Sequence, residues 1–170
     1  MATSEVDIYT KPDRLLSKKE IHGLFMLYNE IFCDNRISGT KKTNLAKDAM
    51  TKSDIFDWYI ARVGGQIVGM ASFVRNMEKA NGPAYDIRPD RGENICSVAV
   101  APKWRQRGIA RMLMQTIIGE HGGEMDLVVE IKRENKLYYG LRTFYESLSF
   151  KEYDEDNLNE HNLFLRRKKE

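Results

Sequence analysis

The sequence predicts a mixed α/β fold, in which a mostly antiparallel central sheet of about six to seven strands is covered by helices. Three observations predict this fold class. Phe56, Trp58 and Ile60 recur with period two, and Gly64-Gly65 separates this strand from an antiparallel partner over residues 66–74, as in a β-hairpin. Residues 95–131 contain an apolar run, a helical pattern and a second apolar run, which indicates a βαβ unit. Further apolar stretches near both ends of the chain add strands.

Before the hairpin, we expect a strand at residues 6–10 and a helix at residues 17–32. Ser17 and Glu20 have the spacing of a capping box at the start of this helix. One face of the helix carries apolar residues at helical spacing, namely Ile21, Leu24, Phe25, Tyr28 and Phe32. The helix is expected to stop at Asp34-Asn35. Residues 35–54 are polar and are predicted to form a loop with a short helix near residues 45–50.

After the hairpin, residues 76–94 are rich in Gly, Pro and Asn and are predicted to be a loop. Strands follow at 95–100 and 126–131, with a helix between them that ends at His121, before Gly122-Gly123. A last helix over 135–148 is expected to bury Leu137, Leu141, Phe144 and Leu148, and strands at 150–153 and 162–166 complete the sheet. No repeat or linker divides the chain, so residues 1–170 are predicted to form a single domain.

Composition is that of an ordinary globular protein, with 42% hydrophobic and 31% charged residues. Twenty-seven basic and 25 acidic residues give a net charge of +2, which argues against a dedicated nucleic-acid-binding protein. We interpret the basic residues 166–169 as a solvated tail. We expect neither a secretory signal nor a membrane span. Cys33 and Cys96 match no metal spacing and are expected to be reduced, which favours a cytoplasmic, reducing compartment and no metal site.

Residues 95–118 hold the strongest functional signal: an apolar strand leads through a basic, glycine-containing turn into a helix. The first N–H groups of a helix lack intrahelical acceptors and carry the positive end of the helix dipole, so they favour a phosphate. Arg105, Gln106 and Arg107 add cations and donors beside these groups. Gly108 and Ala110 keep side-chain bulk low where a phosphate approaches the backbone. Taken alone, such a turn is also compatible with a merely solvated loop.

The turn has neither the GxxxxGK[ST] nor the GxGxxG pattern of other phosphate-binding motifs. It resembles the R/Q-x-x-G-x-G/A motif of the GNAT N-acetyltransferase superfamily, which binds the pyrophosphate of acetyl-CoA. The motif falls on Arg105, Gln106, Arg107, Gly108, Ile109 and Ala110, and the resemblance implies that these residues and the next one, Arg111, bind the cofactor. The resemblance implies the GNAT fold, with its sheet splayed at the acetyl-CoA site. It also implies that the backbones of Val98, Ala99 and Val100 form the strand edge that holds pantetheine.

A second block, residues 144–150 (FYESLSF), resembles the end of the helix that carries the family's general acid. Tyr145 falls on the acid position. Tyrosine suits this role because its reference pKa near 10 keeps it protonated at neutral pH. The alternative reading of Tyr145 is an aromatic side chain packed at the end of an amphipathic helix.

Several residues depart from the family pattern. The asparagine that many relatives carry seven residues before the tyrosine is Tyr138 here, and the usual glycine before the final phenylalanine is Ser149. Ala110 replaces the commoner second glycine of the phosphate motif. The strand before the turn has no carboxylate at residues 95–100, so Glu93 and Glu130 are the nearest candidates for a general base.

These observations predict an acetyl-CoA-dependent N-acetyltransferase that acts by direct transfer to a primary amine: a polyamine, a protein N-terminus, a lysine or another small amine. A cationic acceptor is suggested by the five carboxylates and the absence of basic residues over residues 152–160, although a solvated loop explains them equally well. Two alternatives stay open: a catalytically silent acyl-CoA-binding module, and an unrelated nucleotide-binding domain. The sequence leaves the question of a homodimer open.

Overall fold

A computed structural model describes residues 6–11, 16–32, 50–52, 54–80, 93–130, 137–153 and 162–168. Its strands are β1 (Val6–Lys11), β2 (Phe56–Val63), β3 (Gln66–Val74), β4 (Glu93–Val100), β5 (Met125–Glu130), β6 (Lys151–Glu152) and β7 (Asn162–Arg167). Its helices are α1 (Lys18–Phe32), α3 (Met77–Ala80), α4 (Ile109–His121) and α5 (Leu137–Glu146), with a 3-10 turn over Pro102–Trp104. None of the helices within this described part is long and apolar enough to cross a membrane.

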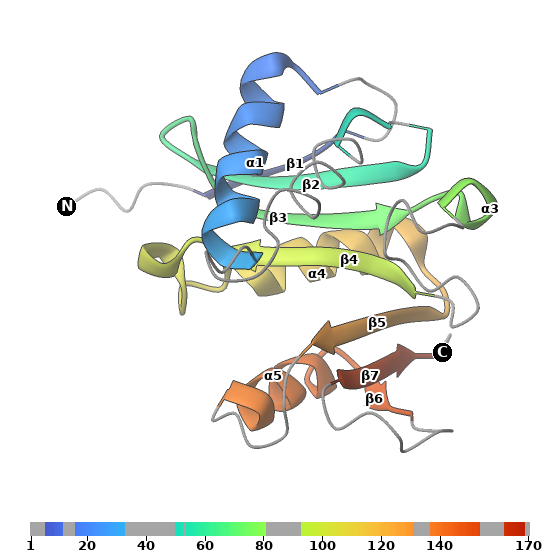
Figure 1. Ribbon diagram of the computed structural model, residues 1–170. Helices are drawn as coiled ribbons and strands as arrows, with labels where there is room; N and C mark the ends of the chain where they lie inside the picture. The colour runs from blue at the N-terminus through green and yellow to red at the C-terminus, as the bar shows by residue number, and fades with distance from the viewer. Residues whose placement is uncertain are drawn as a thin grey trace.

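The seven strands form one sheet in the order β1-β2-β3-β4-β5-β7-β6 (Figure 1). Every neighbouring pair is antiparallel except β4 and β5, which are parallel because α4 makes the crossover between them. Gly64 and Gly65 turn the chain between β2 and β3 with φ values of 56° and 78°, as a two-residue hairpin requires. The mixed, mostly antiparallel sheet and the predicted number of strands are thus confirmed.

Two apolar clusters pack on opposite faces of the sheet. Leu24 and Leu27 of α1 meet Trp58 and Ile60 of β2 on one face. Leu113 of α4 and its neighbours meet the intervening residues of β2 on the other face, as expected from the alternation of side chains along a strand. Because both faces are covered, β2 is buried along almost its whole length, which includes the polar Asp57. Gly69 of β3 lets α4 approach closely, since a Cβ there would lie 3.0 Å from Ile109.

The predicted capping box of α1 is present. The Ser17 N–H donates to Glu20 Oε2 at 2.8 Å, and the Glu20 N–H donates to Ser17 Oγ at 3.2 Å. At the other end of the fold, the expected burial of Leu137 is wrong, since this side chain is 62% exposed. Leu137 is the first described residue of α5, and the buried positions gather at and just after the other end of the helix, where Tyr145 and Leu148 join the α4-side cluster.

The predicted loop over 76–94 is also partly wrong. Asn76 accepts the Lys79 N–H through its side-chain oxygen at 3.1 Å and so starts the single turn of α3. β4 begins two residues before the predicted strand, at Glu93. The predicted end of the first helix at Asp34-Asn35 lies outside the described residues. The same is true of most of the predicted helix near residues 45–50, of which only Met50 is described; Met50 and the next residue, Thr51, are helical.

Candidate functional site

The turn between β4 and α4 has the backbone of an anion site. The Ala101 N–H donates to the Val68 carbonyl at 2.8 Å, which holds the end of β4 on β3. After the 3-10 turn, Gln106 and Gly108 both adopt left-handed conformations, with φ of 61° and 78°. Ile109 follows immediately and is 1% exposed, so it anchors the start of α4 in the core. The residues between these two anchors are exposed except Trp104, which is half-buried and packs against the core.

The first N–H groups of α4 are available to a ligand. The Met112 N–H donates to the Gly108 carbonyl at 3.0 Å, which is the first turn of the helix. By helix geometry the N–H groups of Ile109, Ala110 and Arg111 precede any helical acceptor. Gly108 at the N-cap has no side chain to satisfy them. Together with the helix dipole, these N–H groups favour a phosphate at this point.

The predicted cations surround this turn but have different partners. Arg105 donates from Nε to the carbonyl of Val100 at 3.1 Å and so braces the end of β4. The guanidinium of Arg107 lies over the Trp104 ring, 4.7 Å from its centre. Arg111 reaches in the other direction and donates to Ser147 Oγ, just beyond α5, at 2.7 Å. Arg105 and Arg107 therefore flank the phosphate position, whereas Arg111 points toward α5.

β4 and β5 separate as they approach this turn, as Figure 1 shows. Their register pairs are Glu93 with Asp126 and Ile95 with Leu127, and the described residues show none farther along β4. We call the widening interval between the two strands the β4/β5 split. Its open end lies beside the phosphate turn. A strand edge released in this way offers unpaired backbone groups to an extended ligand.

A bulge in β4 accompanies the split. Cys96 pairs with Ser72 and Ala99 pairs with Met70, so three steps on β4 match two on β3. Ser97, inside this interval, has a left-handed φ of 53°. The bulge reverses the side-chain alternation, because Ile95 packs on the α4 side whereas Ala99 packs on the α1 side. Nothing in the sequence indicated this bulge.

The bulge decides which backbone groups face the split. Ala101 and Ala99 direct their peptide groups toward β3, as the Ala101 hydrogen bond and the pairing of Ala99 require. By alternation, Val98 and Val100 direct theirs toward the split. Of the three predicted backbone positions, Val98 and Val100 therefore face the split, where the Val100 carbonyl also accepts the Arg105 hydrogen bond, and Ala99 lies between them with its own groups facing β3.

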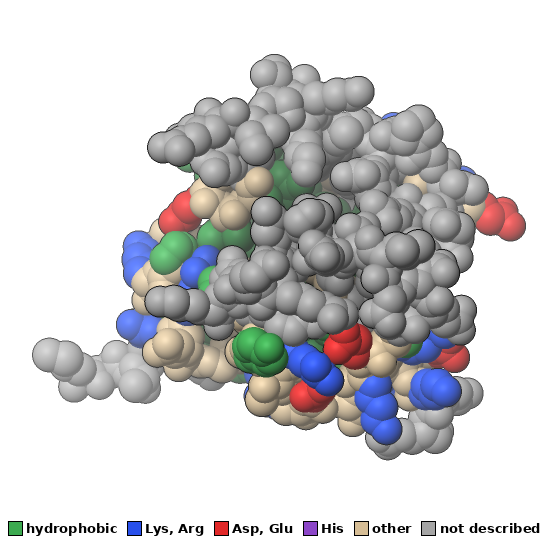
Figure 2. Space-filling model, turned by 60° about the horizontal axis from the view of Figure 1, so that its bottom comes forward, with side chains coloured by type: hydrophobic (Ala, Val, Ile, Leu, Met, Phe, Trp, Pro, Cys, Tyr) green, Lys and Arg blue, Asp and Glu red, His purple; other side chains and the backbone are tan. Residues whose placement is uncertain are grey.

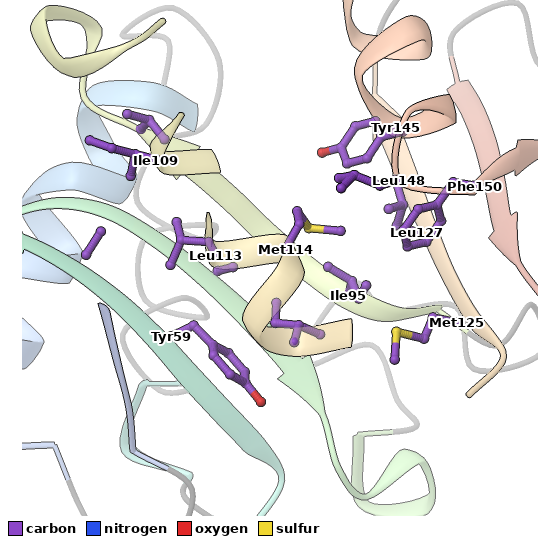
Figure 3. Packing of buried hydrophobic residues seen from close by; sticks show 14 of the residues in the cluster. Tyr59, Ile95, Ile109, Leu113, Met114, Met125, Leu127, Tyr145, Leu148 and Phe150 are labelled. Carbon is purple, nitrogen blue, oxygen red and sulfur yellow. The ribbon is translucent and has the colours of Figure 1, made fainter. Parts of the chain in front are cut away.

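Tyr145 lies on the far side of the split, at the end of α5. Its side chain is 6% exposed and makes edge contacts with Phe144 and Phe150, with ring centres 4.9 Å and 6.1 Å away. Its hydroxyl points away from Phe150, toward the side where Ile109 and the start of α4 lie (Figure 3). Burial raises the pKa of Tyr145 to about 12, which keeps the hydroxyl protonated at neutral pH.

The two candidate bases lie at opposite ends of their strands. Glu93 begins β4 at the closed end of the split, and Glu130 ends β5, where it pairs with Asn162 of β7. Their side chains lie outside the described part of the structure, as do Cys33 and residues 154–160 of the acidic segment. Cys96 is half-buried on β4 beside the bulge.

Sequence reasoning missed a polar cluster at the other end of α4. The Tyr59 hydroxyl donates to Glu120 Oε2 at 2.8 Å and lies 2.7 Å from His121 Nε2, which is in turn 3.7 Å from Asp57 Oδ2. Asp57 also accepts a hydrogen bond from Arg75 Nε at 3.0 Å. The available signal was the carboxylate of Asp57 among the large apolar residues at the start of β2. This cluster lies at the opposite end of α4 from the phosphate turn.

Comparisons with known proteins identify the family and the fold. The family of the acetyltransferase (GNAT) domain matches residues 54–152. A solved structure from Pyrococcus horikoshii OT3 is 20% identical, with a TM-score of 0.67 over 96% of this chain and 99% of that chain. An acyl-CoA N-acyltransferase from Pseudomonas aeruginosa is 17% identical, with a TM-score of 0.66 over the same shares, 96% and 99%.

The PaiA N-acetyltransferase from Thermoplasma acidophilum, whose structure is a complex with coenzyme A, is 15% identical, with a TM-score of 0.59 over 96% of this chain and 99% of that chain. At these identities the solved structures show the shared fold. A comparison with curated protein sequences gives no match.

Proposed function

The chain belongs to the GNAT acetyltransferase domain family, and on that premise we propose that it transfers the acetyl group of acetyl-CoA directly to a primary amine. One observation supports the proposal: the β4/β5 split opens beside the phosphate turn, and from its far side the Tyr145 hydroxyl points toward the start of α4. An arrangement of this kind holds the donor and supplies a proton to the leaving thiolate, which are two of the parts that a thioester-dependent transfer needs.

Acetyl-CoA would bind along the split. Its pyrophosphate would accept hydrogen bonds from the first N–H groups of α4, with Arg105, Gln106 and Arg107 beside it. The amides of pantetheine would pair with the backbone of Val98 and Val100, as an added strand pairs with a sheet edge. Binding at both points fixes the thioester at the level of Tyr145, and this removal of translational and rotational freedom is the main contribution to the rate.

The chemistry is a direct displacement at the thioester carbonyl. The amine nitrogen forms the new C–N bond, the C–S bond breaks, and the leaving thiolate takes the hydroxyl proton of Tyr145. Burial raises the pKa of Tyr145, and the same desolvation raises the pKa of a thiolate released beside it, so proton transfer between them stays feasible. The proton lost by the amine leaves directly or through water, with Glu93 and Glu130 as the candidate bases.

A catalytically silent acyl-CoA-binding module is the competing function. Retention of Tyr145 and of the whole Arg105 to Ala110 turn favours the enzyme. Release of free thiol from acetyl-CoA, followed across polyamines, peptide N-termini, lysine peptides and aminoglycosides, separates the two. The enzyme releases thiol with at least one amine class. A silent module binds CoA in calorimetry and releases no thiol above the rate without protein.

We propose a cationic acceptor on the basis of the acidic segment at residues 152–160. Glu152 is already paired, since Arg142 contacts its carboxylate at 3.2 Å, so the field would come mainly from the residues after it. Replacing Asp154, Glu155 and Asp156 by Asn, Gln and Asn should raise KM for a polycationic amine at low salt and leave KM for acetyl-CoA unchanged. Equal KM values for the amine would show that this segment does not select the acceptor.

A further inference from the structure

Arg111 makes two contacts that cross from α4 to the end of α5. Its guanidinium donates to Ser147 Oγ at 2.7 Å and lies 5.8 Å from the centre of the Phe144 ring. The Ser147 hydroxyl donates to the Phe144 carbonyl at 2.6 Å, so its lone pairs are directed toward Arg111. The two contacted residues flank Tyr145 in the sequence, and the contacts therefore hold the turn of chain that carries the candidate acid.

The position of this hydrogen bond matters because of the β4/β5 split. Backbone pairing between β4 and β5 is confined to Glu93 and Ile95, at the closed end. Arg111 lies in the first turn of α4, at the open end, where the described strands no longer pair. The Arg111–Ser147 hydrogen bond thus joins the two halves of the sheet where backbone bonds do not.

The opposite side of α5 is held by a separate set of contacts. Arg142 contacts Glu146 on its own helix at 2.9 Å and Glu152 of β6 at 3.2 Å. Acidic and basic side chains lie next to one another in the lower part of Figure 2, where the bottom of Figure 1 comes forward. Only the Arg142–Glu152 pair leaves the helix; it joins α5 to β6, in the same half of the sheet, and does not set the distance of α5 from α4.

We propose that the Arg111 side chain is a positioning residue: it holds the end of α5 against α4, so that the Tyr145 hydroxyl faces the thioester in the split. The inference rests on the proposed acetyl transfer. It assigns two separate roles to Arg111: its backbone N–H belongs to the phosphate site, and its side chain positions the candidate acid, Tyr145. Ser147 is its partner, and neither side chain touches the reacting atoms.

Ser147→Ala tests this role away from the phosphate turn. At saturating acetyl-CoA and with chemistry limiting, kcat should fall about fivefold, the factor that corresponds to one ordinary hydrogen bond, with the Kd for CoA unchanged. Backbone amides of residues 145–150 should exchange about fivefold faster with CoA bound. Ser147→Thr, which keeps the hydroxyl, should restore both values. Thr143→Ala, which removes an exposed hydroxyl of α5, should change neither.

Arg111→Lys gives a second line of test, because it keeps the charge near the phosphate but lacks the planar guanidinium. It should lower kcat and leave the Kd for CoA nearly unchanged. Wild-type kcat and exchange in Ser147→Ala would overturn the proposal, as would a loss confined to CoA affinity. If wild-type protein binds CoA but acetylates no amine, the proposed function fails, and the exchange rates alone still decide whether Arg111 and Ser147 hold α5.

Discussion

The N–H of Phe150 donates to the carbonyl of Tyr145 at 3.1 Å, and this hydrogen bond closes the turn that follows α5. The same carbonyl also accepts the Leu148 N–H at 2.9 Å. To make this turn, Ser149 adopts a left-handed φ of 67°, a conformation that favours glycine. The left-handed conformation explains why glycine is common at this position in the family. Ser149 adopts the same conformation with backbone strain.

Ser149→Gly should therefore stabilise the protein. Relief of the left-handed strain outweighs the extra freedom of glycine in the unfolded chain, and we expect about 1 kcal/mol of additional unfolding free energy. Thermal unfolding should show this as an increase in Tm of about 2–4 °C. Ser149→Ala is the matched control, since it removes the hydroxyl but keeps a Cβ at the same φ, and it should give no increase. Equal Tm values for the glycine and alanine variants would show that the backbone conformation of Ser149 does not destabilise the protein.

Tyr145→Phe tests the acid. Loss of a positioned acid should lower kcat by about a hundredfold to ten-thousandfold. The Kd for acetyl-CoA should hardly change, because the hydroxyl acts on the leaving sulfur. Stability should also be maintained, because the ring contacts with Phe144 and Phe150 remain. Single-turnover kinetics give the relevant rate, and a variant that kept more than about half of it would remove Tyr145 from the mechanism.

His121 predicts a pH dependence of stability. Burial lowers the pKa of His121, and this effect exceeds the opposing influence of the Asp57 and Glu120 carboxylates, with the Arg75 cation acting in the same direction as burial. The folded protein then binds fewer protons than the unfolded chain just below the ordinary pKa of histidine. Stability should consequently decrease as the pH falls from about 7 toward 5.

The measurement is Tm against pH for the wild type and for His121→Gln, which cannot titrate. Because the one hydroxyl proton of Tyr59 is donated to Glu120, the His121 Nε2–H must donate to the Tyr59 oxygen, and a glutamine amide offers a similar donor. In His121→Gln, the slope of Tm against pH between pH 5 and 7 should be flatter than in the wild type. The control His22→Gln, at an exposed position of α1, should not flatten the slope by the same amount. Identical slopes in the two variants would exclude His121 as the cause.

Much of the fold could be predicted because local chemistry determines it. The capping box of Ser17 and Glu20, the glycine pair at 64–65 and the alternation in β2 all act within a few residues. The bulge at Ser97 could not be predicted, because it follows from how β3, β4 and β5 pair across long separations. The sequence suggested a phosphate role for Arg111. It gave no sign of the contact between Arg111 and Ser147, because these residues are 36 positions apart in the chain.

The acetyl-CoA assignment of the turn depends on Gly108 at the start of α4. This glycine has a φ of 78°, and a Cβ added to it would meet no protein atom within 4 Å. Gly122 at the other end of α4 has a φ of 43° and equally open surroundings. Alanine at either position should cost about 1 kcal/mol of stability through the left-handed conformation. Only at Gly108 would the new methyl group also lie beside the N–H groups assigned to the pyrophosphate.

Calorimetric titration of acetyl-CoA into wild-type protein, Gly108→Ala and Gly122→Ala is thus the most direct test of the central claim. We predict that Gly108→Ala weakens binding by about tenfold or more, the effect of displacing a phosphate from charge-assisted N–H contacts, while Gly122→Ala binds as the wild type does. Equal affinity in all three folded proteins would contradict the claim that this turn binds the pyrophosphate.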